Sequence, residues 1–99
     1  MAELRVLKPA QKFLKQLSGK HLRQLMQALE ALETNPYPID SKALKGTPYQ
    51  QHGLRRKDVG EYRVVYSVKE EKIVIVTVVL IGKRNDDEVY RALARLYGR

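Results

Sequence analysis

The sequence predicts a small α+β domain in which helices pack against an antiparallel sheet. Two runs rich in β-branched and aromatic residues, 61–68 and 73–81, are separated by four charged residues and predict a β-hairpin. Before them, apolar residues recur at three- and four-residue spacing over residues 9–34, which is typical of amphipathic helices. Because a run of helices is followed by a run of strands, we expect the strands to form one sheet and the helices to pack against it.

A strand and two helices are predicted at the start of the chain. Residues 3–7 alternate between polar and apolar side chains as in a short strand. Pro9 then begins a helix, because its fixed φ and missing N–H cost little at the first helical position. Ser18 and Gly19 end this helix, and a second one follows over residues 20–34. Its buried face is predicted to hold Leu22, Leu25, Met26, Leu29 and Leu32.

Three strands and a final helix are predicted after a long connection over residues 35–53, which is rich in Pro, Gly and polar side chains. A short basic segment within it, residues 42–46, is anchored by Leu44. Residues 53–59 predict a strand that Gly60 turns into the hairpin, and short connections favour antiparallel pairing. The last helix is expected to bury Val89, Leu93 and Leu96. The predicted order is an N-terminal strand, a helical hairpin, a three-stranded antiparallel sheet and a C-terminal helix.

Arg63 interrupts the apolar pattern of the hairpin. Strand alternation places residues 62, 64 and 66 on one face and residues 63, 65 and 67 on the other. The second run is apolar almost without alternation, as in a strand covered on both faces. A cation in so apolar a hairpin is the first indication of a functional site.

Length and composition limit the class of protein. Ninety-nine residues suit one domain, residues 1–99, and a hydrophobic fraction of 43% allows a modest core. The absence of cysteine excludes disulfides, thiolate nucleophiles and cysteine-ligated zinc, and fits a reducing cytoplasm. The longest apolar run has nine residues, far short of the roughly 20 that span a bilayer. We therefore expect a soluble cytoplasmic protein that is not in a membrane.

The net charge of +8 comes from 19 Lys and Arg against 11 Asp and Glu. Such a balance on a small domain favours a polyanionic partner, usually nucleic acid, although an acidic protein partner fits the same charge. The two histidines, His21 and His52, have no neighbours at metal-ligand spacing, and no glycine-rich phosphate loop or paired-carboxylate pattern is present. The sequence therefore predicts no metal site and no cofactor. His52 lies beside the predicted basic strand and is a candidate for contact with a substrate.

Cations and one tyrosine gather around the three predicted strands, namely Arg55, Arg56, Lys57, Arg63, Lys83, Arg84 and Tyr90. If the strands pair in order, these positions can converge on one face, although alternation separates Arg56 from Arg55 and Lys57. Clustered guanidinium groups bind phosphates bidentately, and a tyrosine ring can stack on a nucleobase. The alternative interpretation is a solvated basic patch.

The segments that carry a resemblance, in chain order, are Leu44-Lys45-Gly46, Gly60-Glu61-Tyr62-Arg63-Val64-Val65-Tyr66, Gly82-Lys83-Arg84 and Val89-Tyr90. Their ordered combination resembles the RelE family of bacterial toxins, in the RelE/ParE superfamily of type II toxin–antitoxin systems. The similarity covers essentially the whole chain, including its length and order of elements, and implies a RelE-like fold.

The resemblance implies an mRNA interferase, an endoribonuclease that enters the ribosomal A site, cuts the message and inhibits translation. It also implies a cognate antitoxin, which we expect to be acidic and amphipathic. The family's catalytic positions carry over to Arg63, Arg84 and Tyr90, and one of the two cations of its basic strand matches Arg56. The other falls on Leu54, for which Arg55, Lys57 or His52 can substitute after a small shift. Asp58 stands where many relatives have a basic residue.

The implied chemistry needs no metal, because the RNA 2′-OH attacks the adjacent phosphorus and leaves a cyclic phosphate and a free 5′-OH. Arg63 and Arg84 are assigned to the phosphate charge, since arginine stays protonated. Tyr90 is assigned to base stacking, proton transfer or both. Contacts with mRNA and with the rRNA of the small subunit are assigned to Lys45, Arg55, Lys57 and Lys83. Two alternatives remain: a ParE-like gyrase inhibitor without nuclease activity, and an inactive module that binds RNA or a partner.

Overall fold

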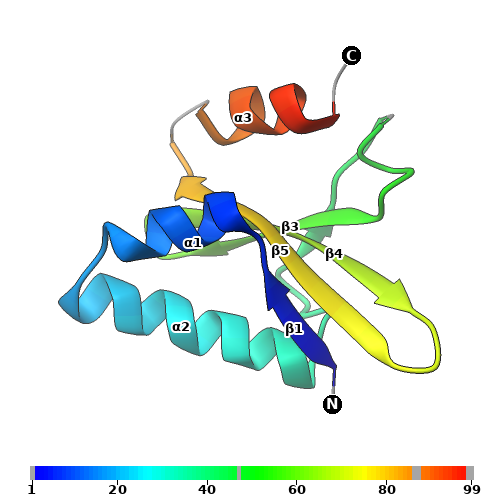
Figure 1. The fold of residues 1–99 in the computed structure, drawn as a ribbon, viewed down its shortest axis with the longest axis horizontal. Helices are drawn as coiled ribbons and strands as arrows, with labels where there is room; N and C mark the ends of the chain where they lie inside the picture. The colour runs from blue at the N-terminus through cyan, green and yellow to red at the C-terminus, as the bar shows by residue number, and fades with distance from the viewer. Residues whose placement is uncertain (1, 47, 86–87, 98–99) are drawn as a thin grey trace.

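The computed structural model describes residues 2–46, 48–85 and 88–97, which form a five-stranded mixed sheet with three helices (Figure 1). In chain order the elements are β1 (Glu3–Val6), α1 (Lys8–Lys15), α2 (Gly19–Thr34), β2 (Lys42–Ala43), β3 (Leu54–Val59), β4 (Tyr62–Glu70), β5 (Val74–Lys83) and α3 (Glu88–Tyr97). The predicted α+β class is confirmed, and the predicted elements occur in the predicted order, with β2 in addition.

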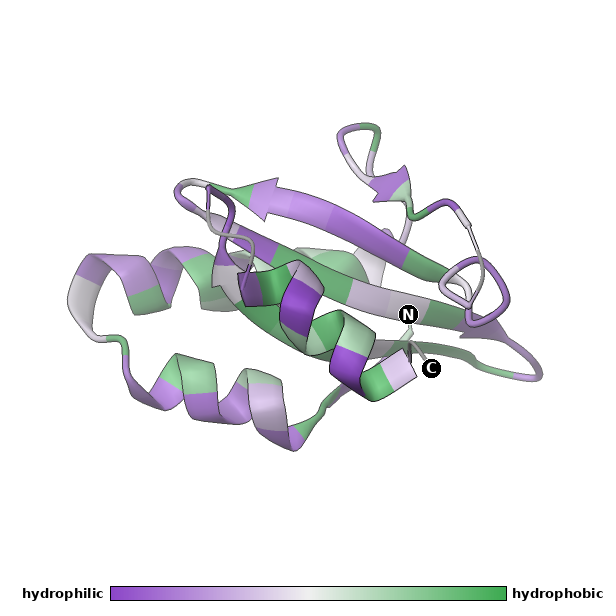
Figure 2. Ribbon diagram, turned by 90° about the horizontal axis from the view of Figure 1, so that it is seen from above, coloured by the Kyte–Doolittle hydropathy of each residue, from purple (hydrophilic) through white to green (hydrophobic). Residues whose placement is uncertain are grey.

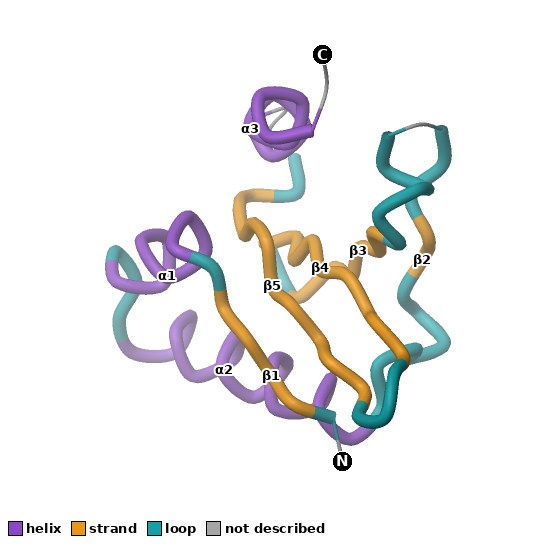
Figure 3. Tube along the Cα trace, turned by 45° about the vertical axis from the view of Figure 1, so that its right-hand side comes forward, coloured by secondary structure: helices purple, strands orange, loops and turns teal. Residues whose placement is uncertain are grey.

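The sheet is larger than predicted, with the strand order β1-β5-β4-β3-β2 (Figure 3). The antiparallel pairing of β3, β4 and β5 is as expected. At one edge, β1 pairs in parallel with β5, and at the other edge the two-residue β2 pairs antiparallel with β3. The parallel pairing joins segments far apart in the sequence, and β2 has only two residues, so local residue patterns indicate neither.

The helices divide between the two faces of the sheet. Helices α1 and α2 cover one face, and α3 packs on the other (Figures 1 and 3). The first face buries Leu25, Leu29, Leu32, Tyr62, Val64 and Tyr66. The second, smaller core contains Val65, Val79, Leu80, Val89 and Leu93. The alternation of β4 thus directs Arg63 and Val65 toward α3, as predicted from the sequence.

An irregularity in β5 changes which side chains face α3. Val65 is opposite Leu80, whereas the next residue, Tyr66, is opposite Val78, so Val79 is an extra residue in the ladder. As a result both Val79 and Leu80 belong to the core under α3. With Val76 and Val78 in the other core, β5 is covered on both faces, as its unbroken apolar sequence predicted.

Two predicted core residues are instead exposed. Met26 is 41% exposed, because it flanks the stripe of leucines that α2 buries. Leu96 is 51% exposed, since the stripe that begins at Val89 and Leu93 continues to Tyr97. Both predictions were wrong by about one position around a helix, where the stripe has an edge.

β3 differs from its neighbours in polarity. Between the buried ends Leu54 and Val59, its four central residues are all charged, and the strand is mostly purple in Figure 2. Strands β4 and β5, by contrast, supply 9 of the 19 buried residues described in the two cores. None of the helices within the described ranges has the length and apolarity of a membrane span.

Candidate functional site

The turn between β3 and β4 sets two charged residues directly opposite each other. Gly60 adopts a φ of +57°, which favours glycine, and Val59 pairs with Tyr62 across the turn. The next pair outward is Asp58 and Arg63. Directly opposite residues of an antiparallel pair have side chains on the same face, so the turn brings this carboxylate and guanidinium together.

Arg63 is held on two sides. Its Nε donates to Asp58 Oδ1 at 2.7 Å and its Nη2 to Oδ2 at 3.2 Å, which is a bidentate pair. Its Nη1 donates to the Tyr90 hydroxyl at 2.8 Å, and the guanidinium carbon lies 5.7 Å from the centre of that ring. Only 16% of the Arg63 side chain is exposed. Its orientation is therefore fixed by β3 on one side and α3 on the other.

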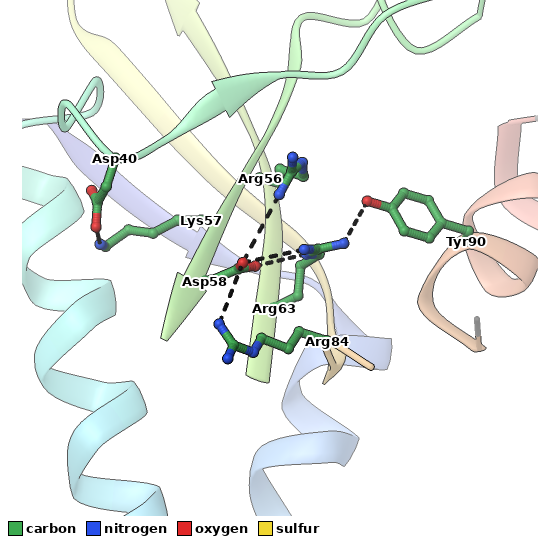
Figure 4. A network of polar contacts seen from close by, with 7 residues as sticks. All are labelled: Asp40, Arg56, Lys57, Asp58, Arg63, Arg84 and Tyr90. Carbon is green, nitrogen blue, oxygen red and sulfur yellow. Dashed lines mark hydrogen bonds and ion pairs between the residues drawn. The ribbon is translucent and has the colours of Figure 1, made fainter. Parts of the chain in front are cut away.

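Two further guanidinium groups approach the same carboxylate (Figure 4). Nη1 of Arg56 lies 4.0 Å from Asp58 Oδ2, and Nη1 of Arg84 lies 3.8 Å from it. Arg56 precedes Asp58 by two positions on β3 and so shares its face. The backbone N–H of Arg84 donates to the carbonyl of Glu61 at 2.9 Å, which ties the end of β5 to the turn. We call Arg56, Asp58, Arg63 and Arg84 the arginine cluster.

Within the arginine cluster, Asp58 and Arg63 each favour the charged state of the other. The hydrogen bonds from Arg63 are the main cause that holds the pKa of Asp58 below its ordinary value. The same bonds raise the pKa of Arg63 above its ordinary value. Three cations around one carboxylate leave a local charge of 3 − 1 = +2. Permanently charged guanidinium groups bind and stabilise anions and are poor proton carriers.

A glycine in β5 allows Tyr90 to reach the arginine cluster. Gly82 is opposite Arg63 in the sheet, and a Cβ added to it would lie 2.4 Å from Val89 Cγ2. Helix α3 therefore packs closely against this point of β5, and the next residue, Tyr90, lies over Arg63. This role of Gly82 is missing from the sequence prediction, because the close approach depends on the packing of α3.

Arg55 and Lys57 lie on the opposite face of the sheet. Arg55 Nη2 donates to Ser41 Oγ at 2.8 Å, and its guanidinium lies 5.1 Å from the centre of the Tyr37 ring. Lys57 Nζ donates to Asp40 Oδ2 at 2.6 Å. The two residues are therefore separated from the arginine cluster, as strand alternation predicted.

The remaining predicted RNA contacts are Lys83 and Lys45. Lys83 is exposed and opposite Tyr62, which places it on the face of Arg55. Lys45 is exposed just after β2 and lines a groove of about 750 Å³. The described lining of this groove also includes Lys42, Arg55 and Arg56. Arg56 thus connects the groove to the arginine cluster.

Leu54 stands where the resemblance implied a second basic-strand cation. Leu54 is 1% exposed and belongs to the core under α3. The His52 ring lies 4.7 Å from that of Tyr97, so its described contact is with the end of α3. Besides Arg56, the residue of β3 that belongs to the arginine cluster is Asp58. Its position opposite Arg63 follows from the length of the turn. Within the described part of the chain, no group of three His, Cys, Asp or Glu side chains is placed to hold a metal ion.

Comparisons with known proteins identify the family to which this fold belongs. The family model of the ParE toxin of the type II toxin–antitoxin system parDE matches residues 4–88. A sequence comparison with curated proteins gave no match. Among solved structures, a double arginine-to-alanine mutant of the E. coli toxin RelE in the free state is 30% identical, with 97% of this chain and 99% of that chain covered and a TM-score of 0.71.

Two similar structures contain an antitoxin. The archaeal RelE–RelB complex from Pyrococcus horikoshii is 28% identical, covering 84% of this chain and 94% of that chain, with a TM-score of 0.68. The intact E. coli RelBE toxin–antitoxin complex is 26% identical, covering 84% and 96%, with a TM-score of 0.67. Since the family model spans most of the sequence and the fold matches RelE structures, this chain belongs to the RelE/ParE superfamily of toxins of type II toxin–antitoxin systems.

Proposed function

We propose that this toxin is a ribosome-dependent mRNA endoribonuclease that cuts the message in the A site. The observation that supports the proposal most is the convergence of Arg56, Arg63, Arg84 and Tyr90 on one face of the sheet. They lie on β3, on β4, one residue after β5 and on α3, respectively. Three fixed cations beside a tyrosine hydroxyl are suited to a reaction that develops negative charge on a phosphate.

The reaction is transfer within the RNA chain. The 2′-oxygen attacks the adjacent phosphorus and loses its proton, while the bond to the 5′-oxygen breaks and that oxygen gains a proton. The products are a 2′,3′-cyclic phosphate and a free 5′-OH. Arg63 and Arg84 stabilise the charge on the phosphoryl oxygens, and Arg56 adds a third cation. Tyr90 carries a hydroxyl that can transfer a proton and a ring that can stack on a base.

The basic groove beside β2 extends the proposed site. Its volume of about 750 Å³ and its lining by Lys42, Lys45 and Arg56 suit a single RNA strand. Arg55 also lines it, but its guanidinium is held by Ser41 and the Tyr37 ring. Arg56 belongs to both the groove and the arginine cluster. We propose that nucleotides flanking the cleaved phosphate follow this groove, with mRNA and small-subunit rRNA as the polyanionic partners.

The proposed regulatory partner is an antitoxin that is acidic and amphipathic. Two of the similar structures are toxin–antitoxin complexes, and the net charge of +8 favours an acidic partner. An apolar groove of about 370 Å³ lies where Phe13 of α1, Ile81 of β5 and Val89 of α3 meet. This groove suits the apolar face of a helix or strand. Co-expression with the neighbouring small reading frame tests the pairing, and failure to co-purify would count against it.

Expression of the toxin without an antitoxin, followed by mapping of mRNA 5′ ends, tests the nuclease proposal. We expect new 5′ ends in phase with codons for the wild type and their loss in Arg84→Ala. A matched control is Arg95→Ala, which also removes one arginine, from an exposed position in the last turn of α3. Wild-type expression that arrests growth without new 5′ ends would contradict the proposal.

The second candidate function is inhibition of gyrase. The matching family model is described as the ParE toxin, which supports this candidate. A gyrase inhibitor would induce a DNA-damage response without cutting mRNA, and this response would persist in Arg84→Ala. Normal growth with neither response would indicate an inactive binding module.

A further inference from the structure

The arginine cluster already contains an anion. The Asp58 carboxylate lies between Arg56, Arg63 and Arg84 in Figure 4 and is within 4.0 Å of a nitrogen of each. A carboxylate and a phosphodiester both present two oxygens that a guanidinium can bind side by side. A phosphate that contacts all three arginines would therefore occupy the position of this carboxylate.

Of the three arginines, Arg63 makes the closest contacts with Asp58. The edge formed by its Nε and Nη2 is used by the bidentate pair, and Nη1 donates to Tyr90. Arg56 and Arg84 are 4.0 and 3.8 Å from the carboxylate, beyond ordinary hydrogen-bond distance, and Arg84 is 47% exposed. An incoming phosphate can therefore reach Arg84 and Arg56 first, while Arg63 must exchange Asp58 for the phosphate.

We propose that Asp58 is an internal substitute for the RNA phosphate and lowers the affinity of the site by competing for Arg63. The inference rests on the proposed function, because it takes the competing anion to be a phosphate of RNA. It adds Asp58 to the site as a residue that determines the affinity and specificity of RNA binding. Asp58 reduces the cluster from three net positive charges to two and repels a nearby phosphate. Short RNA alone therefore binds weakly, and additional polyanionic contacts are needed for tight binding.

The test compares two Asp→Asn variants that remove the same charge. Asp58→Asn keeps the shape of the side chain inside the arginine cluster. Asp40→Asn removes the carboxylate that pairs with Lys57 on the opposite face. The probe is a short single-stranded RNA with 2′-O-methyl groups at every position, which cannot undergo 2′-OH attack. Its dissociation constant is measured by fluorescence anisotropy over a range of salt concentrations.

Asp58→Asn should bind this probe about tenfold more tightly than wild type, because Arg63 no longer pairs with a charged competitor. The slope of log affinity against log salt should steepen by about 0.7, as for one more phosphate neutralised on a single strand. Asp40→Asn should change the affinity by no more than about twofold, since it gives only the general change in net charge. Equal or weaker binding by a folded Asp58→Asn variant would overturn the proposal, as would equal tightening by both variants.

NMR of the wild-type protein tests the same proposal without requiring that a variant fold correctly. The ¹³C signal of the Asp58 carboxyl group is followed by NMR as the 2′-O-methyl RNA is added. A shift larger than that of the Asp40 carboxyl is expected, because the phosphate takes Arg63 from Asp58. Saturation with RNA that leaves the Asp58 signal unchanged would overturn the proposal.

Cleavage assays on ribosomes separate this inference from the proposed function. If Asp58→Asn binds the probe more tightly but neither protein cuts mRNA, Asp58 competes as inferred and the nuclease proposal fails. If the wild type cuts mRNA and Asp58→Asn binds no more tightly, the nuclease proposal holds and the role of Asp58 is overturned.

Discussion

The two faces of β3 use neighbouring residues in different ways. On the face toward α2, Lys57 has one carboxylate partner, Asp40, and Arg55 is held by Ser41 and the Tyr37 ring. On the face toward α3, Arg56 is one of three arginines around a single carboxylate. On the first face each cation therefore has its own partners. On the second face three arginines share one carboxylate, so positive charge is in excess.

This difference shows that basic composition alone does not locate a phosphate site. Three consecutive cations in β3 supply charge to both faces, but only one face receives further arginines from β4 and the end of β5. It is also the face on which α3 brings a tyrosine hydroxyl to Arg63. Variants on the two faces should therefore affect different properties, namely catalysis on one and stability on the other.

Arg63→Ala should have the greatest effect on activity. Loss of the central guanidinium should lower the rate of mRNA cleavage on ribosomes by about 10²- to 10³-fold, the typical cost of removing one charge-stabilising donor. Arg5→Ala is the control, because Arg5 also pairs with a carboxylate, Glu3, but lies on β1. Cleavage by purified protein is measured together with thermal unfolding. A folded Arg63→Ala variant with near wild-type cleavage would contradict the assignment.

Tyr90→Phe should reduce turnover while retaining the ring. If the hydroxyl transfers a proton, kcat should fall by about 10²-fold, with a smaller change in KM because the ring can still stack. Tyr97→Phe makes the same chemical change in the same helix, beside His52 and away from Arg63. Single-turnover kinetics on ribosomes would compare the two. Equal effects of both substitutions would indicate a general role of α3 instead.

Arg56→Ala and Arg55→Ala compare the two faces at adjacent positions. Arg56→Ala should weaken binding of a 2′-O-methyl RNA by about fivefold and reduce the salt slope by about 0.7, since one phosphate contact is lost. Arg55→Ala should instead lower the free energy of unfolding by about 1 kcal/mol, because a hydrogen bond to Ser41 and a contact with the Tyr37 ring are lost. The reverse pattern, from anisotropy and urea unfolding, would place the RNA on the other face.

The smallest effect concerns pH and stability. The pKa of Asp58 is lowered in the folded state, mainly by Arg63, so its ionised form stabilises the fold above the ordinary value of 3.8. This contribution is lost as pH falls through the lower folded pKa. The cations facing Asp58 are Arg63, Arg56 and Arg84, which all lower its pKa, while partial burial of the carboxylate opposes them.

Near neutral pH, Asp58→Asn should therefore be less stable than wild type by about 1 kcal/mol, and this difference should vanish well below the ordinary pKa. Urea unfolding of both proteins across the acidic range measures it. A constant difference at all pH values would show that the ion pair with Arg63 is not its source.

The sequence was most informative where local chemistry determines structure. The helical stripe of α2, the hairpin and the alternation around Arg63 all follow from residue types at fixed spacing. The convergence of Arg63, Arg84 and Tyr90 on one face was also predicted from the expected strand pairing, and the resemblance to the RelE family assigned their catalytic roles. The structure adds that Arg63 and Arg84 meet at Asp58, whereas Tyr90 contacts Arg63.

Features that depend on long-range packing could not be predicted in the same way. The parallel pairing of β1 with β5 joins distant segments, and β2 has only two residues. The close approach of α3 depends on Gly82, whose role becomes visible only when Val89 is placed against it. Asp58 was within reach of sequence reasoning, since a two-residue turn with Val59 opposite Tyr62 already sets it opposite Arg63.

NMR of the arginine side chains locates the RNA most directly. The Nε–H signals of wild-type protein are recorded as a 2′-O-methyl RNA is added, and each arginine reports its own face of the sheet. Binding at the arginine cluster should shift the signals of Arg56, Arg63 and Arg84 and leave that of Arg55 nearly unchanged. A dominant shift at Arg55 with Arg63 unchanged would contradict a phosphate site on the α3 face.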